Sequence, residues 1–371
     1  MRITGILLAT CLMAMLLSGC WDQQLLKDVR IIDISGLDLE PDGKLRNTSS
    51  VMDVSGSQST QKESNEVHSG KGDTTRDLRD ILDREISGIY SSSKLRVILI
   101  GEALAKEGIY PYLDVLYRDP TSALNAKIAV VEGSAREAIN IKKVGTKLIG
   151  EHFNKLIQSM ERKTVVPDVN LQLACPSMLT QGNDFAAPYI TKTETSPTIS
   201  GIALFYNDKM TGTLSAEDSL LYLLMADKLA KDANLTLKVE NAENQRPENY
   251  IAIDIQSLKR RLKINVQDGR NIKVKLDLKL KVTAIEYPRD HLNEKKHVTS
   301  LDNTIGEELT RRALAITKKI QQANHDGFGI GQRIQAYYPN TWKRLHWPDD
   351  YAKVEFDPKV TVHVVNHGIM N

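Results

Sequence analysis

The chain has 371 residues, of which 41% are hydrophobic and 26% are charged, a composition typical of globular proteins. This length indicates two or three domains. Its 49 basic and 47 acidic residues leave a net charge of only +2, which argues against a nucleic-acid-binding protein. The mean hydropathy of −0.32 excludes a protein with many membrane spans. Three cysteines are too few for a disulfide scaffold or a four-cysteine zinc site.

The N-terminus carries the most specific pattern in the sequence. Arg2 precedes an apolar run at residues 6–17, which is too short to span a membrane but is typical of a signal peptide. Two small residues and then Cys20 follow, as in the bacterial lipobox. We predict that residues 1–19 are a signal peptide and that Cys20 carries S-diacylglycerol and N-acyl chains. An uncleaved helix with an incidental cysteine is the alternative.

Lipidation of Cys20 would attach the protein to a membrane. A diacylated residue is a stable anchor, whereas a single chain binds only marginally. No later segment has eighteen consecutive apolar residues, so the sequence offers no membrane-spanning helix beyond the leader. We therefore expect a soluble body on the outer face of a bacterial cell membrane. In the mature chain Cys175 is the remaining free thiol, so no intrachain disulfide can form.

Residues 20–195 are predicted to form an N-terminal α/β region. Strand and helix patterns alternate along it, which is typical of α/β units. The expected strands lie at residues 29–54, as a hairpin around Pro41-Asp42-Gly43, and at 97–100 and 127–131; the expected helices start after Thr74 and cover about 134–141 and 147–161. Residues 55–73 contain a single large apolar residue, Val67, and are expected to form a mobile loop that proteases cut first.

Residues 196–371 are predicted to form a C-terminal α+β domain, because the composition shifts to Gly, Asn, Thr and Pro at 181–200. The expected elements are strands at 201–206, 210–214, 262–266, 272–282 and 354–365, and helices starting at about 216 and covering 305–324. The predicted fold class is therefore α+β, a multi-domain mixed α/β chain with antiparallel-rich sheets, each covered by helices.

No stretch of the sequence has the spacing of a known catalytic or cofactor site. The glycines at 327–331 lack the strand-to-helix setting and the spacing of a dinucleotide fingerprint, and Gly327 is expected to end a helix. His325 and Asp326 are expected at that helix end, where an imidazolium suits the dipole. Cys175 is expected to be an inert, small apolar residue. We therefore expect no enzymatic activity and no cofactor.

One acidic loop resembles a metal site only superficially. Asp38, Glu40 and Asp42 imitate the first positions of a calcium-binding EF-hand loop. The twelfth position, however, is Ser49 where the motif requires a glutamate, and the flanking segments have strand patterns rather than helical ones. We therefore expect no metal site in this loop.

Two features each allow two interpretations. The basic run Lys259-Arg260-Arg261-Lys263, with the lysine face of residues 272–282, could contact anionic lipid headgroups or form a solvated strand face. Trp342 and Trp347 could be core anchors or part of an interface.

A series of short motifs, in one order along the chain, resembles a known family. Gly19-Cys20-Trp21-Asp22 is similar to the mature start of the Ger(x)C family, the lipoprotein C subunits of spore germinant receptors. Further matches are Gly36-Leu37-Asp38, Val97 through Gly101-Glu102, Arg118-Asp119, Gly133, Gly201 through Phe205, Lys209, Gly212, Leu214-Ser215-Ala216-Glu217, Phe328-Gly329-Ile330-Gly331, Pro339, Trp342, Trp347 and Gly368. The polar tract at 55–73 and the short spacing of the last two tryptophans depart from the family pattern.

The resemblance implies a non-catalytic subunit on the spore inner membrane that takes part in the germination response to nutrients. It implies integral-membrane receptor subunits of the A and B type as partners, whereas the expectation of no nucleic-acid partner comes from the balanced charge. It also implies a three-domain body, which would divide the N-terminal region near 115–125. A solute-binding lipoprotein of a transporter and a lipid-anchored enzyme are the alternatives.

Overall fold

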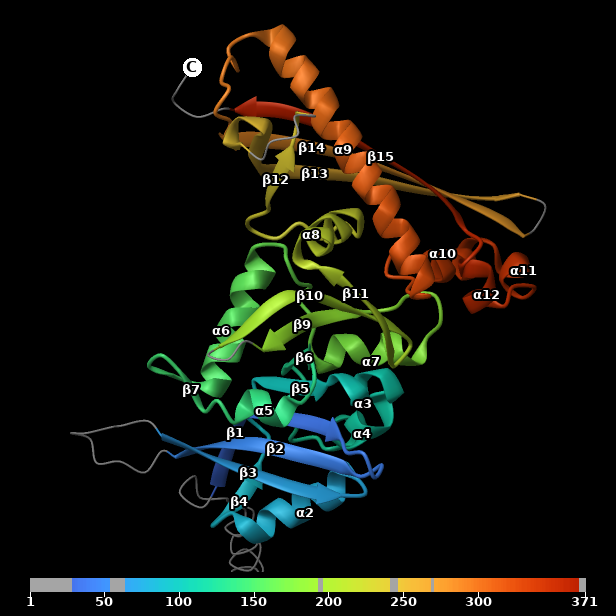
Figure 1. Cartoon of the computed structure of the whole chain (residues 1–371). Helices are drawn as coiled ribbons and strands as arrows, with labels where there is room; N and C mark the ends of the chain where they lie inside the picture. The colour runs from blue at the N-terminus through green and yellow to red at the C-terminus, as the bar shows by residue number, and fades with distance from the viewer. Residues whose placement is uncertain (1–28, 54–63, 193–195, 241–245, 268–269, 367–371) are drawn as a thin grey trace, which may run out of the picture.

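The computed structural model describes residues 29–53, 64–192, 196–240, 246–267 and 270–366 (Figure 1). Its largest sheet contains β1 (Val29–Leu39), β2 (Leu45–Asp53), β3 (Ser64–Gly72), β4 (Ile89–Ser91), β5 (Val97–Gly101), β6 (Lys127–Val131), β9 (Ala186–Lys192), β10 (Pro197–Tyr206) and β11 (Lys209–Ser215). In the described residues the strand order is β11-β10-β9-β6-β5-β1-β2-β3, with β4 beside β1. The central strands β1, β5 and β6 are parallel.

Helices cover both faces of this sheet because its central strands are apolar on both sides. In β5, Val97 and Leu99 face one core, whereas Ile98 and Ile100 face the other. The first core includes α5 (Ala135–Ile139) and α6 (Ile149–Arg162). The second includes α2 (Thr75–Glu85), α3 (Glu102–Glu107), α4 (Tyr110–Arg118) and α7 (Leu171–Leu179). A small hairpin, β7 (Lys143–Val144) and β8 (Lys147–Leu148), precedes α6.

A second sheet contains the C-terminal strands. Its order is β12 (Asn234–Lys238), β13 (Tyr250–Gln267), β14 (Asn271–Glu286) and β15 (Glu355–Asn366), with β13 and β14 antiparallel and β15 parallel to β14. The helix α8 (Ala216–Met225) lies between the two sheets, and every residue from Ser219 to Met225 is buried. An all-round apolar helix is typical of such a fully covered position.

The long helix α9 (Lys295–Gln322) crosses the second sheet and ends beside three short helices (Figure 1). These are α10 (Ile330–Tyr337), α11 (Pro339–Trp342) and α12 (Trp347–Tyr351). The buried stripe of the long helix α9 includes Ile305, Leu309 and Ile316. On the neighbouring edge strand β15, the N–H of Val360 donates to the Thr310 hydroxyl at 2.9 Å, and the N–H of Val364 donates to the Asp302 carboxylate at 2.8 Å. Side chains of α9 thus cover backbone donors of the edge strand.

The predicted fold class and most predicted elements are confirmed. Antiparallel-rich sheets, each covered by helices, are present, and the expected strands at 97–100, 127–131 and 272–282 lie within β5, β6 and β14. The helix after Ser215 starts as expected, and the Ser215 hydroxyl accepts the Asp218 N–H at 3.3 Å. The helix predicted to start at residue 305 begins ten residues earlier, at Lys295.

The polar tract predicted to be a mobile loop is, in its second half, a strand. Residues 64–72 form β3, paired antiparallel with β2, while 54–63 lie outside the described residues. The prediction failed because backbone pairing to β2 and packing on α2 order a strand that has few apolar side chains of its own. A Cβ added to Gly70 would lie 3.1 Å from the Ile81 side chain, so the helix approaches closely.

The two expected domain divisions remain predictions. The division between residues 195 and 196 lies between β9 and β10, which are antiparallel neighbours in one sheet. The division near 115–125 covers the last turn of α4 and most of the connection from α4 to β6.

Candidate functional site

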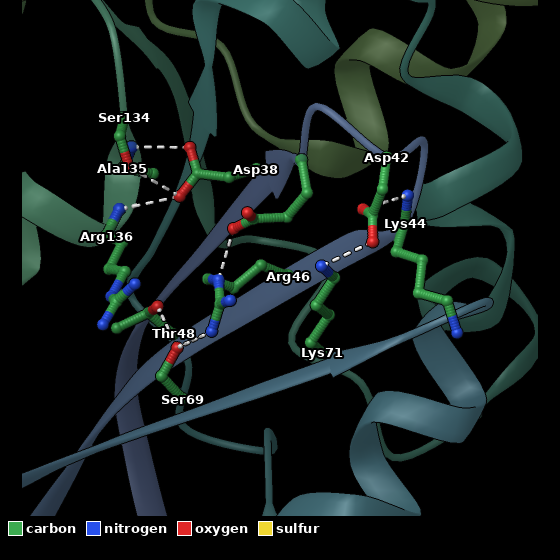
Figure 2. A network of polar contacts seen from close by, with 11 residues as sticks. Asp38, Asp42, Lys44, Arg46, Thr48, Ser69, Lys71, Ser134, Ala135 and Arg136 are labelled. Carbon is green, nitrogen blue, oxygen red and sulfur yellow. Dashed lines mark hydrogen bonds and ion pairs between the residues drawn. The ribbon is translucent and has the colours of Figure 1, made fainter.

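Three motif segments that are far apart in the sequence meet at one edge of the nine-stranded sheet. Asp38 lies at the end of β1, Gly101 at the end of β5, and Gly133 follows β6. These strands are parallel, so their carboxyl ends share an edge. The Asp38 carboxylate accepts the N–H groups of Ala135 and Arg136, each at 2.8 Å, and the Ser134 hydroxyl at 3.0 Å (Figure 2).

This contact fixes the start of α5 against β1. Burial raises the pKa of Asp38, and the hydrogen bonds from Arg136 and Ala135 oppose that rise. A Cβ at Gly101 would lie 2.1 Å from Asp38 Oδ1, so the strand end needs a glycine at that point. Because the chain's own donors surround the carboxylate, the geometry assigns Asp38 a positioning role.

The neighbouring acidic side chains have separate partners. Glu40 contacts Arg46, and Asp42 pairs with Lys71 at 2.6 Å (Figure 2). Asp38, Glu40 and Asp42 therefore point toward different groups, unlike the converging ligands of a calcium loop. Among the described residues, no group of three or more His, Cys, Asp or Glu side chains is placed to hold a metal ion.

A second polar cluster joins the nine-stranded sheet to the C-terminal helices. His325 is fully buried, with Nδ1 2.6 Å from the Phe205 carbonyl and Nε2 2.7 Å from the Tyr222 hydroxyl. Because a carbonyl can only accept, Nδ1 carries the proton and Nε2 accepts from Tyr222. Burial lowers the pKa of His325 to about 4, so the ring is neutral near pH 7.

The expectation of an imidazolium at a helix end is therefore wrong. The long helix ends at Gln322 rather than near Gly327, and Asn324 has a left-handed φ of 53°. This turn leads the chain into the interior, so His325 leaves the helix axis and is desolvated. Gly327 does not end the helix.

Asp326 caps the following helix from inside the protein. Its carboxylate accepts the N–H groups of Ile330 at 2.9 Å and Gly331 at 2.7 Å.

Asp326 also exchanges hydrogen bonds with Asp184. The backbone N–H of Asp326 donates to the Asp184 carboxylate at 2.8 Å, and the backbone N–H of Asp184 donates to the Asp326 carbonyl at 3.0 Å. The other Asp184 oxygen accepts the Asn207 N–H at 3.0 Å. We refer to His325, Asp326, Asp184 and Tyr222 as the junction cluster.

Two glycines of the 327–331 segment, Gly329 and Gly331, allow the chain to form this cap. Gly329 is the N-cap of α10 with a φ of 66°, a conformation that favours glycine. A Cβ at Gly331 would lie 2.7 Å from the ring of Trp347, which is 3% exposed. Of the two interpretations of the tryptophans, Trp347 is a core residue, and the half-buried Trp342 packs against it with ring centroids 5.5 Å apart.

Sequence reasoning missed Asp184 and Tyr222. Neither lies in a local pattern that separates it from an ordinary loop or core residue, and the Tyr222–His325 contact joins residues 103 positions apart.

Of the two cysteines considered in the sequence analysis, the structure describes Cys175. Its thiol is partly exposed, and burial raises the thiol pKa, which disfavours the nucleophilic thiolate. Cys20 lies outside the described residues.

A small cavity lies between β1, α2 and α4. Ser35, Asn47, Tyr90 and the Arg79–Asp119 ion pair line it, and its volume is about 40 Å³. This volume has room for a few water molecules, whereas pockets for drug-sized ligands usually have about 300–1,000 Å³. This cavity is therefore too small for a drug-sized solute. Larger and more open hollows, of about 580 Å³ and 710 Å³, lie at the surface beside Lys127 and between α9 and β15.

The buried acids should make stability depend on pH. Burial raises the pKa of Asp184 to about 6 in the folded chain, against about 3.9 for an unfolded aspartate. Its contribution to stability is therefore full below about pH 4 and is lost as the pH rises through about 6. Asparagine at position 184 does not titrate in this range. As the pH rises from about 4 through about 6, the free energy of unfolding of Asp184→Asn should therefore increase relative to that of the wild type, by up to about 3 kcal/mol.

Denaturant unfolding at both ends of that pH range measures this trend. Asp349→Asn is the control, because the Asp349 side chain is 71% exposed. An equal trend in both variants would contradict the role given to Asp184.

Two family models match almost all of the chain. One is described as the spore germination protein N-terminal domain and matches residues 22–192; the other, described as spore germination B3/GerAC like, C-terminal, matches residues 200–368. The chain belongs to the Ger(x)C family of spore germination proteins. The resemblance drawn from the short motifs is thereby confirmed.

Curated members of the family align over nearly their whole length. The chain is 22% identical over 362 residues to spore germination protein GerQC of Bacillus cereus, covering 96% of this chain and 97% of the relative. It is 24% identical over 405 residues to spore germination protein KC of Bacillus subtilis (strain 168), covering 97% of each.

The fold is also that of a solved structure. The crystal structure of the GerBC protein superposes with a TM-score of 0.60, covering 90% of this chain and 97% of GerBC at 16% identity. In the part of the Ger(x)C chain that is described, no helix has the length and apolar character to cross a bilayer.

Proposed function

We propose that this chain is the lipid-anchored C subunit of a spore germinant receptor and acts by binding integral-membrane subunits of the A and B type. The observation that carries the proposal is the match of both family models over residues 22–192 and 200–368, which begins two residues after Cys20. Curated relatives aligned from end to end are named spore germination proteins.

The polar clusters support binding rather than catalysis. Asp38 and Asp326 both accept hydrogen bonds from the starts of the chain's own helices. His325 donates a hydrogen bond to the Phe205 carbonyl and accepts one from the Tyr222 hydroxyl. A catalytic acid or base must instead reach a substrate within hydrogen-bond distance. Each of these groups therefore serves to position the chain.

Anchoring at Cys20 explains how such a subunit would work. Acyl chains on Cys20 would hold the body on the outer face of the spore inner membrane, beside the integral-membrane subunits. Confinement to one surface raises the effective concentration of the partners, so a modest interface is enough to keep a complex together. The subunit would then bias the response of its neighbours to nutrients.

Deleting the chain tests this assignment. Spores without it should germinate more slowly with at least one nutrient, and a tagged copy purified from solubilised spore membranes should bring down A- and B-type subunits. A complementing copy is the control for both measurements. Normal germination with every nutrient tested, in spores that also lack related C subunits, would contradict the receptor function.

A further inference from the structure

One face of the second sheet carries a dense group of basic side chains. Residues 272–282 of β14 alternate, so that the even-numbered apolar residues are buried while the odd-numbered ones lie on the opposite face. A register shift between Ile255 and Ser257 brings odd-numbered residues of β13 onto that same face. We define the basic face as the exposed side chains of Lys259, Arg261, Lys263, Lys275, Lys279 and Lys281.

The charge of the basic face is not balanced locally. The alternating positions 259–263 of β13 and 273–281 of β14 carry seven basic residues and one acidic residue, Asp277. Lys273 pairs with Glu355 of β15 at 2.8 Å, and with this glutamate included the net charge is +5. The whole chain has a net charge of only +2. On the adjoining strand β15, Asp357 lies opposite Lys275 and Lys359 lies opposite Asp277, so these two residues add no net charge. Positive charge is therefore concentrated on this face, while the rest of the chain has a net charge of −3.

The strand register places like charges side by side. Lys259 lies directly opposite Lys279, and Lys263 lies directly opposite Lys275. Like charges at opposed positions destabilise an antiparallel pair. A facing group of acidic side chains would turn this repulsion into attraction, and it would also add electrostatic steering to association.

Arg260 is separate from the basic face, although it lies within the same basic run of the sequence. Its guanidinium lies on the packed side of the sheet, 5.9 Å from the centre of the Phe328 ring. Burial lowers its pKa. The lipid-contact interpretation treated Lys259, Arg260, Arg261 and Lys263 as one surface. The strand alternation instead places Arg260 on the packed side of the sheet and the other three on the exposed side.

We propose that the basic face docks an Asp- and Glu-rich segment of a partner protein. The basic face belongs to the second sheet, which lies at one end of the molecule, whereas β1, whose first residue is Val29, lies toward the other end (Figure 1). Val29 follows Cys20 by nine residues, which extend to about 30 Å at most. An anchor at Cys20 therefore holds the other end of the molecule at the membrane, and this step rests on the proposed function. The basic face then points toward protein rather than lipid headgroups.

Charge reversal tests the proposal on the full lipidated chain in detergent. The test variant is Lys259→Glu/Lys275→Glu/Lys279→Glu. The matched control is Lys295→Glu/Lys296→Glu/Lys318→Glu, which makes the same charge change at exposed positions of α9. The first probe is a fluorescent poly-L-glutamate peptide, followed by anisotropy. The second is phosphatidylglycerol vesicles, followed by flotation, with the same variants made in the full-length Cys20→Ala chain and without detergent, so that acyl chains do not carry the protein to the vesicles.

We expect the wild type and the control to bind poly-L-glutamate and the test variant to bind at least about tenfold more weakly. The binding should also weaken as salt is added. In spores, a photo-crosslinker at position 279 should attach to an Asp- or Glu-rich segment of another protein, whereas one at position 318 should not.

Two results would overturn the proposal. Equal poly-L-glutamate binding by the test variant and the control would show that the basic face does not select acidic protein. The second result is that the wild type and the control bind the vesicles, the test variant does not, and none of the three binds the peptide. This result would identify anionic lipid as the occupant. Neither result bears on the receptor function, because the deletion experiment measures that separately.

Discussion

Replacing Cys20 with alanine should release most of the protein from the membrane and impair germination as severely as deletion of the chain. The physical reason is that diacylation provides a stable anchor, whereas the described residues contain no helix able to cross a bilayer. Membrane fractionation, with mass spectrometry of the N-terminal peptide, measures the release directly.

The matched control for this prediction is Cys175→Ala, which removes a partly exposed thiol on α7 and leaves the lipobox intact. This variant should remain on the membrane and support germination. A membrane-bound wild-type protein with an unmodified Cys20 would contradict the anchoring prediction.

Replacing Asp326 with alanine should lower the free energy of unfolding of the C-terminal part by about 3 kcal/mol, because two buried N–H groups lose their acceptor. These are the N–H groups of Ile330 and Gly331 at the start of α10. Removal of a desolvated carboxylate, whose pKa burial raises to about 7, offsets part of this cost. Tryptophan fluorescence during denaturant unfolding reports on the site, because Trp347 packs at Gly331.

Asp349→Ala is the control for this substitution, since the Asp349 side chain is 71% exposed and pairs with an exposed histidine. It should unfold like the wild type. An Asp326→Ala protein of unchanged stability and normal abundance that no longer supports germination would indicate a chemical role for the carboxylate. That result would overturn the positioning role given to the junction cluster.

Periodicity was sufficient to predict the elements that bury one side of a regular pattern. The alternation of residues 272–282 identified β14, and the polar capping residue Ser215 identified the start of α8. In both cases the signal is local, because neighbouring side chains alone decide which face is apolar. The mixed, helix-covered sheets followed from the same patterns.

Pairing between distant segments could not be predicted in this way. The strand β3 has little hydrophobic pattern and exists because β2 and α2 lie beside it. His325 was assigned to a helix end because the sequence does not reveal Phe205 and Tyr222, which desolvate it. Asp184 gave no local signal, since its partners Asn207 and Asp326 lie 23 and 142 residues away.

The cover that α9 places over β15 has a consequence for contacts between copies of this chain. An open strand edge is a template on which a second copy can add its own strand, and the proposed anchor would bring copies together on one surface. On β15, Pro358 has no N–H to offer, and Thr310 and Asp302 already engage the donors of Val360 and Val364. The sheet can therefore expose its broad side to a different protein, while this part of its β15 edge resists pairing with a second copy.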